Sequence, residues 1–258
     1  MSIHEELKLT TVEPGSVGIW WLGQSSYALK NAADEIIYID PYLTDVISPL
    51  SYIMHTRLIA PVIDPEAEVD VLGVLITHDH LDHLDPNSAV MLAAKPDTMF
   101  YGSDDVFDKL VRVLDIPEAR VESVKVSPDF EVGHYAVHTV KAVHGGGAVG
   151  YVIQVDGLTL YFSGDTVLFY SMRDIGAAYD IDVAFFCING QAGNMDILSA
   201  LHAVTLTSPR MVVPNHYGMY ADNTADPEKF AYLFSRRFPN KTCLILEPGR
   251  LHRFARAT

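Results

Sequence analysis

Four side chains able to ligate a metal stand together in one short segment. His78, His80, Asp82 and His83 fall within six residues, with the spacing H-x-H-x-D-H. Imidazole and carboxylate ligands together suit Zn²⁺, Mn²⁺ or Fe²⁺. Two histidines at positions i and i+2 can converge on one metal from a tight loop, and the aspartate–histidine pair that follows can hold a second. The alternative is a solvated, histidine-rich turn without a ligand.

This segment lies between a predicted strand and a predicted helix. Residues 69–76 form a mostly apolar run that is typical of a buried strand. After the motif, Asp85 and Pro86 indicate the start of a helix, which residues 89–94 continue with good helix formers. A strand, a polar loop and a helix place the candidate ligands at a rigid sheet edge, where functional sites are common in layered α/β proteins.

The rest of the chain alternates between apolar, strand-like runs and helical segments. We expect strands at residues 17–22, 27–30, 36–40, 70–77, 98–101, 120–126, 135–143, 149–155, 158–162, 182–188, 211–214 and 242–247. We expect helices at 87–94, 104–114, 168–178, 195–207 and 227–237. A series of strands with helices occurs twice along the chain. This repeat predicts an α/β (α+β) fold, a four-layer αββα sandwich. The first half of the sandwich is expected to end with strand 135–143. No linker rich in Gly, Pro or Ser divides residues 1–258, so we expect a single domain.

The motif resembles the signature of the metallo-β-lactamase fold superfamily. Further segments resemble that superfamily in the required order: Trp20–Ser26, Asp40–Leu43, Val143–Gly145, Ser163–Thr166 and Pro214–Tyr217. Within the superfamily, residues 188–195 and 214–227 look most like the UlaG-type branch, the L-ascorbate-6-phosphate lactonase-like hydrolases. The resemblance covers nearly the whole chain and implies a metallo-β-lactamase-type αββα sandwich.

The resemblance also implies a set of seven metal ligands. His78, His80 and His144 would hold a first divalent ion, Asp82, His83 and His216 a second, and Asp165 would bridge the two. Zn²⁺ or Mn²⁺ is expected, and iron is possible, because an all-His/Asp site accepts all three. Independently of the family, all seven residues fall where predicted strands end in loops.

Each ligand outside the motif has a structural alternative. His144 precedes three glycines and could be an ordinary turn histidine. Asp165 follows an apolar run and could cap a helix. His216, at a strand end, could be a core histidine with satisfied hydrogen bonds.

The metals would supply hydroxide at neutral pH to attack a carbonyl carbon or a phosphorus, and would stabilise the oxyanion that develops. Asp82 and Asp165 would take part through the metals, and Asp79 could orient a ligand or shuttle a proton. Ser163 lies in S-G-D-T rather than G-x-S-x-G, which disfavours a serine hydrolase. The lactonase resemblance implies hydrolysis of a lactone, such as a sugar-acid phosphate lactone. The alternatives are a phosphodiesterase of the same fold, acting on a small phosphodiester or cyclic nucleotide, and a metal-dependent sensor without turnover.

Candidate substrate contacts come from the segments that resemble the lactonase branch. Asn189, Asn194, Tyr217 and Tyr220 could bind hydroxyls or a phosphate, although turn and capping roles are equally open. Arg57 and Arg250 are candidate anion binders, and His55 could touch substrate. Residues 42–65 are long for a plain connection and could form a lid or a solvated insert.

Composition narrows the class of partner. With 18 Lys and Arg against 33 Asp and Glu, the net charge is −15, which disfavours nucleic-acid binding. A small anionic substrate stays possible because bound cations would invert the local potential. We expect no membrane span and no signal peptide. Cys187 and Cys243 lie in apolar runs and suggest reduced thiols in the cytoplasm. The branch resemblance allows a homo-oligomer.

Overall fold

The computed structural model describes residues 1–51, 56–67, 69–126, 129–145 and 147–256. Within them, the strands form two seven-stranded sheets. The first sheet has the order β14-β1-β2-β3-β4-β5-β6. Its strands are β1 (Ser16–Gly23), β2 (Ser26–Lys30), β3 (Ile36–Ile39), β4 (Val71–Leu75), β5 (Met99–Gly102), β6 (Val121–Ser123) and β14 (Leu251–Ala255). From β14 to β3 neighbouring strands are antiparallel, and from β3 to β6 they are parallel.

The second sheet mirrors this arrangement with the order β13-β12-β11-β10-β9-β8-β7. Its strands are β7 (Phe130–Val132), β8 (Tyr135–Lys141), β9 (Val149–Val155), β10 (Leu158–Phe162), β11 (Val183–Cys187), β12 (Met211–Asn215) and β13 (Thr242–Cys243). Strands β7 to β10 are antiparallel, and β10 to β13 are parallel.

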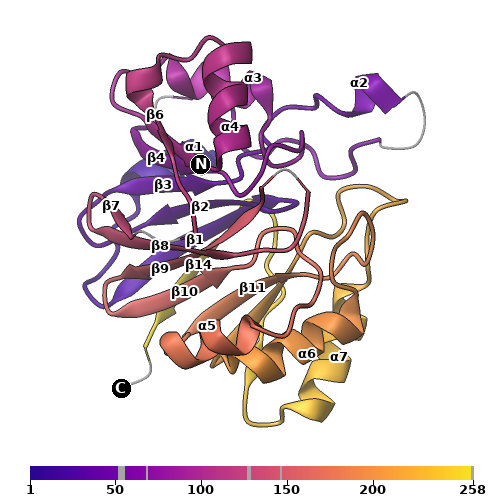
Figure 1. The fold of residues 1–258 in the computed structure, drawn as a ribbon. Helices are drawn as coiled ribbons and strands as arrows, with labels where there is room; N and C mark the ends of the chain where they lie inside the picture. The colour runs from indigo at the N-terminus through magenta and orange to yellow at the C-terminus, as the bar shows by residue number, and fades with distance from the viewer. Residues whose placement is uncertain (52–55, 68, 127–128, 146, 257–258) are drawn as a thin grey trace.

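Helices cover the outer faces of both sheets (Figure 1). Above the first sheet lie α3 (Pro86–Ala93) and α4 (Asp104–Asp108), and α4 continues into a π-helical turn at Lys109–Val113. Below the second sheet lie α5 (Met172–Ala178), α6 (Ile197–Thr207) and α7 (Pro227–Arg237). Shorter elements are α1 (Ile3–Leu9), α2 (Ser48–Ser51) and a 3₁₀ turn at Glu118–Arg120. The layers therefore follow the expected αββα order.

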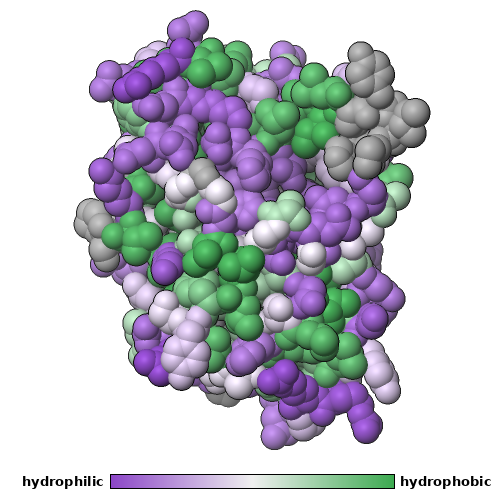
Figure 2. Space-filling view, turned by 45° about the vertical axis from the view of Figure 1, so that its right-hand side comes forward, coloured by the Kyte–Doolittle hydropathy of each residue, from purple (hydrophilic) through white to green (hydrophobic). Residues whose placement is uncertain are grey.

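The core is divided by the first sheet. Trp21 belongs to the large apolar cluster that lies between the two sheets and continues under α6 and α7, whereas its neighbour Trp20 belongs to the cluster under α3 and α4. This alternation is what a strand buried on both faces produces, because successive side chains point to opposite sides. On the face shown in Figure 2, hydrophilic residues cover much of the upper part, and apolar patches lie both near the top and lower down. No helix of the described residues is long and apolar enough to cross a membrane.

Three differences from the sequence expectation concern pairing or local winding. Strand 135–143 was expected to close the first half, but β8 pairs with β9 in the second sheet. The short connection between these strands favours an antiparallel hairpin. The last strand, β14, returns to the first sheet beside β1. The helix expected over 104–114 is α-helical only to Asp108.

Candidate metal centre

Strand ends from both sheets bring the seven predicted ligands together. His78, His80, Asp82 and His83 lie in the loop between β4 and α3. The other three come from the second sheet, where His144 follows β8, Asp165 follows β10 and His216 follows β12. Their ligand atoms form two groups, within each of which all atoms lie within 4.8 Å of one another: His78, His80, His144 and Asp165, and Asp82, His83 and His216.

The first group is made chiefly of imidazoles. His80 Nδ1 lies 2.9 Å from His78 Nε2 and 3.3 Å from His144 Nε2, so three ring nitrogens point at one small volume. Burial, followed by the nearby His83, holds the pKa of His78 well below its usual value. Burial and the neighbouring His144 also lower the pKa of His80. These two rings are therefore neutral at pH 7 and can offer lone pairs to a cation.

The second group mixes imidazoles with carboxylates. His216 Nε2 lies 3.3 Å from Asp82 Oδ2 and 3.3 Å from Asp165 Oδ2. Burial lowers the pKa of His83, but the carboxylates of Asp165, Asp40 and Asp82 outweigh it and raise that pKa well above the usual value. In the same way, Asp165 and Asp82 overcome burial and raise the pKa of His216 to about 9.

The carboxylates respond in the opposite direction. Burial alone would raise the pKa values of Asp82 and Asp165, but His83 and His216 hold both well below the usual range. Both carboxylates are therefore ionised at neutral pH. Each is a strong ligand for a divalent cation in that form.

Two buried atoms support the fit to a cation. His83 Nε2 and Asp165 Oδ1 are 3.3 Å apart, yet neither has a hydrogen-bond partner among the described residues. Leaving buried polar atoms unsatisfied is costly unless something else binds them. The Asp165 carboxylate also lies between the two groups, 3.3 Å from His83 and His216 and 3.9 Å from His144. The donor set and its orphaned atoms fit divalent cations.

Comparisons with known proteins show the family to which the chain belongs. Residues 36–217 match the family model described as the β-lactamase superfamily domain. The chain is 31% identical over 220 residues to a UPF0173 metal-dependent hydrolase of Pyrobaculum arsenaticum, covering 82% of this chain and 89% of that relative. A relative with the same description from Thermococcus onnurineus is 31% identical over 244 residues, covering 91% of this chain and 98% of that relative.

The chain belongs to the metallo-β-lactamase superfamily. Within it, the relatives place the chain in the UPF0173 metal-dependent hydrolase family. Among solved structures, Igni18, a metallo hydrolase from Ignicoccus hospitalis, has a TM-score of 0.73 at 24% identity, covering 94% of this chain and 100% of the other. An isothiocyanate hydrolase from Delia radicum gut bacteria has a TM-score of 0.74 at 18% identity, covering 92% of this chain and 99% of the other. At these identities, the two structures show the shared fold.

In this UPF0173 hydrolase, Asp40 orients a candidate ligand that sequence reasoning did not connect to it. Asp40 Oδ2 lies 2.7 Å from His83 Nδ1, which turns His83 Nε2 toward Asp82 and Asp165. The Asp40 carboxylate also accepts hydrogen bonds from the backbone N–H and hydroxyl of Thr77, both at 2.7 Å. The signal in the sequence was its position, because parallel strands β3 and β4 end at the same sheet edge.

Two amides hold the candidate carboxylate ligands. Gln24 Nε2 donates to Asp82 Oδ2 at 2.8 Å and lies 3.2 Å from His216 Nε2. Asn194 Nδ2 donates to Asp165 Oδ2 at 2.7 Å. Gln24 comes from the turn between β1 and β2, and it was quoted in the family motif without a role. Asn194 was expected to contact substrate, whereas here its amide contacts a candidate ligand.

The other candidate substrate residues are well buried. Asn189 donates to Asn223 Oδ1 at 2.7 Å. Tyr217 is 6% exposed and packs on Trp21, with ring centroids 4.9 Å apart. Tyr220 is 2% exposed, and its hydroxyl donates to the Tyr42 hydroxyl at 2.6 Å. A contact between any of them and substrate stays a prediction.

The two candidate anion binders have other partners. The Arg57 guanidinium donates to the carbonyls of Ile59 at 2.6 Å and Thr44 at 2.7 Å, and also to that of Tyr42. Within the segment that was considered as a lid, Arg57 therefore ties the start, at Tyr42 and Thr44, to Ile59. Arg250 is largely exposed and pairs with Glu247 at 2.7 Å. His55, the third candidate from the sequence, lies outside the described residues.

Proposed function

We propose that this protein hydrolyses a lactone or a related small cyclic ester, and that it does so with two divalent cations, Zn²⁺ or Mn²⁺, with iron possible. His78, His80 and His144 would hold the first cation, and Asp82, His83 and His216 the second. The observation that carries the proposal is the position of Asp165, whose carboxylate lies within reach of both groups. A shared carboxylate of this kind is characteristic of two-metal hydrolytic sites.

When bound, the cations would lower the pKa of water toward neutrality and stabilise negative charge on the substrate. The chain's own residues arrange the site around them. Asp40, Gln24 and Asn194 fix the orientation of His83, Asp82 and Asp165. Asp79 is half-buried beside the exposed His80, which makes its carboxylate the candidate for passing a proton to the leaving alcohol.

The proposed substrate is a small molecule, and an anionic lactone such as a sugar-acid phosphate lactone remains our first choice. Because Arg57 and Arg250 are engaged elsewhere, the cations themselves would supply most of the attraction for an anionic group. Cys187 and Cys243 are both free thiols, which supports the cytoplasm as the proposed compartment. A single domain and a homo-oligomeric state also remain proposals.

Metal content and substrate turnover, measured on the same sample, test this proposal. Protein purified without chelators should contain about two equivalents of Zn or Mn by elemental analysis. It should hydrolyse a sugar lactone or a homoserine lactone, lose activity with a chelator, and regain it when the metal is restored. Turnover of bis-p-nitrophenyl phosphate alone would replace the lactonase with a phosphodiesterase. Protein that binds no metal after reconstitution would overturn the whole assignment.

A further inference from the structure

His80 differs from the other six candidate ligands in how its ring is held. Each of those six has a hydrogen-bond contact outside the ligand set: Thr77 for His78, Gln24 for Asp82 and His216, Asp40 for His83, the Gly193 carbonyl for His144 and Asn194 for Asp165. Within the described residues, the ring of His80 has hydrogen-bond contacts only with His78 and His144. His80 is also the exposed member of the set, so core packing does not fix it.

The backbone on both sides of His80 is nevertheless fixed. The His80 carbonyl accepts hydrogen bonds from the N–H groups of His83 at 3.0 Å and Leu84 at 2.7 Å. The carbonyl of the preceding residue, Asp79, accepts a hydrogen bond from the Lys109 ammonium. Because both peptide planes flanking the Cα of His80 are held, the imidazole keeps only its side-chain torsions as freedom.

Lys109 reaches this carbonyl from a rigid element. It is the first residue of the π-helical turn that follows α4, and single π-turns often mark functional sites. The helix lies tightly on β5, since a Cβ placed on Gly102 would meet Val106 Cγ1 at 2.4 Å. The start of the same helix lies against the His144 loop, where a Cβ on Gly147 would be 3.4 Å from Asp105 Oδ2.

We propose that Lys109 is the positioning residue of His80 and that it acts through the Asp79 carbonyl. It fixes the peptide from which His80 projects, so that His80 Nδ1 faces the nitrogens of His78 and His144. This inference rests on the metal assignment proposed above, because it requires these three nitrogens to share one cation.

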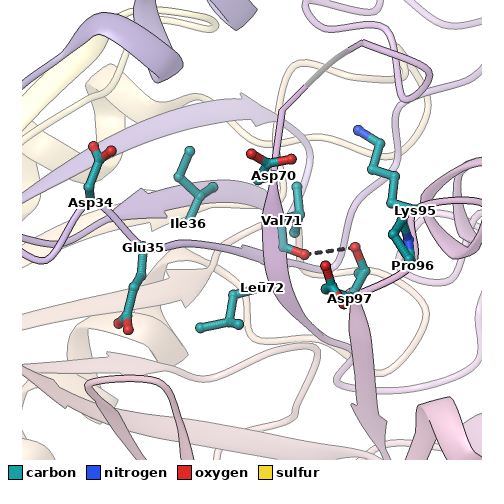
Figure 3. Close-up of a pocket in the computed structure, with 10 residues that line it drawn as sticks. Asp34, Glu35, Ile36, Asp70, Val71, Leu72, Lys95, Pro96 and Asp97 are labelled. Atoms are coloured by element: carbon teal, nitrogen blue, oxygen red, sulfur yellow. Dashed lines mark hydrogen bonds between the residues drawn. The ribbon is translucent and has the colours of Figure 1, made fainter.

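The test is a Co²⁺ titration of Lys109→Met, followed by visible absorption and elemental analysis. We expect affinity for the first cation to fall about 10- to 100-fold, as for other residues that orient metal ligands. The matched control is Lys95→Met, which removes a similar half-buried ammonium from the carbonyls of Ala67 and Val69 at the far end of β4. Figure 3 shows Lys95 there, on the rim of a cavity of about 280 Å³. Lys95→Met should bind Co²⁺ as the wild type does.

A double-mutant cycle with His80→Ala separates positioning from a general loss of stability. If Lys109 acts through His80, Lys109→Met should cost little further affinity once His80 is removed. Lys109→Ala, which also removes the donor, replaces the Met variant if circular dichroism shows that the latter does not fold. Wild-type protein that takes up no Co²⁺ would overturn the proposed function. Wild type and both Lys109 variants binding Co²⁺ equally, or full additivity with His80→Ala, would overturn this inference alone.

Discussion

The two groups of the candidate centre differ in the protonation of their histidines and in how firmly those histidines are oriented. The imidazoles of His78 and His80 have lowered pKa values, so they offer free lone pairs at neutral pH, but His80 is exposed and indirectly held. His83 and His216 are buried and firmly oriented, but their raised pKa values mean that protons occupy them. The difference teaches that orientation and readiness for a cation are separate properties, and that neither group combines both in all of its members.

The largest effect should come from the residue that the two groups share. Asp165→Ala should remove both cations and abolish activity, as measured by metal content and turnover. In protein stripped of metal, it should also lower the free energy of unfolding at pH 7 by about 3–5 kcal/mol, because His83 and His216 would lose a buried partner. Asp174→Ala, at an exposed aspartate on α5, is the control. A variant that kept two metals per chain would contradict the bridging assignment.

A second prediction sharpens the contrast in protonation. His216 has a folded pKa of about 9, so at pH 7 a cation must displace its proton, and the same holds for His83. Binding through His216 should therefore weaken about tenfold for each unit that the pH falls below 9, and the displaced proton of His83 adds a further loss in the same direction. Binding to the first group should release few protons from His78 and His80, because these two rings are already neutral.

Calorimetry in two buffers of different ionisation enthalpy measures this release. We expect about two protons for the full uptake of metal at pH 7, and His216→Ala should reduce that number. Metal uptake without proton release would show that the two groups do not differ in this way. The raised pKa of His216 also affects the stability of protein stripped of metal. Ion pairing of His216 stabilises the folded protein fully below the usual histidine pKa of about 6.5, and that contribution is lost as pH rises through 9.

The smallest effect concerns one amide. Asn194→Ala removes the hydrogen bond to Asp165 Oδ2 and should weaken metal affinity about tenfold. Asn189→Ala removes an amide that bonds to Asn223 instead, and should leave metal affinity unchanged. Competition with a chromogenic chelator measures both. If Asn194→Ala changed KM for a lactone without changing metal affinity, Asn194 would be a substrate contact, as the sequence first suggested.

The sequence was sufficient for elements whose signal is local. The apolar runs located most strands, and helix α7 was predicted with its observed bounds of Pro227–Arg237. Strand pairing could not be read from local patterns in the same way, so β8 was placed in the first half of the sandwich although it pairs in the second sheet. Strand β14, Leu251–Ala255, was missed because it is half-buried and carries a histidine and an arginine, which blurs its apolar pattern.

The same distinction between local and long-range signals applies to the site. The seven candidate ligands stand in recognisable motifs, and the structure brings them together. The contacts that orient them come from residues distant in sequence, such as Gln24 with Asp82, 58 positions apart. Nothing in the types of such residues reveals a contact that depends on which strand ends and turns lie side by side at the sheet edge. Lys109 also stands at the start of a local change from α- to π-helix, which helix propensity does not encode.

The pairing of β14 with β1 has a consequence for synthesis on the ribosome. Strand β1 (Ser16–Gly23) is made long before β14 (Leu251–Ala255), its neighbour on one side. Until Leu251–Ala255 emerge, one edge of β1 keeps unpaired N–H and carbonyl groups, which is the kind of edge that invites pairing with another chain. The nascent first sheet therefore passes through an aggregation-prone interval that ends only when β14 is added.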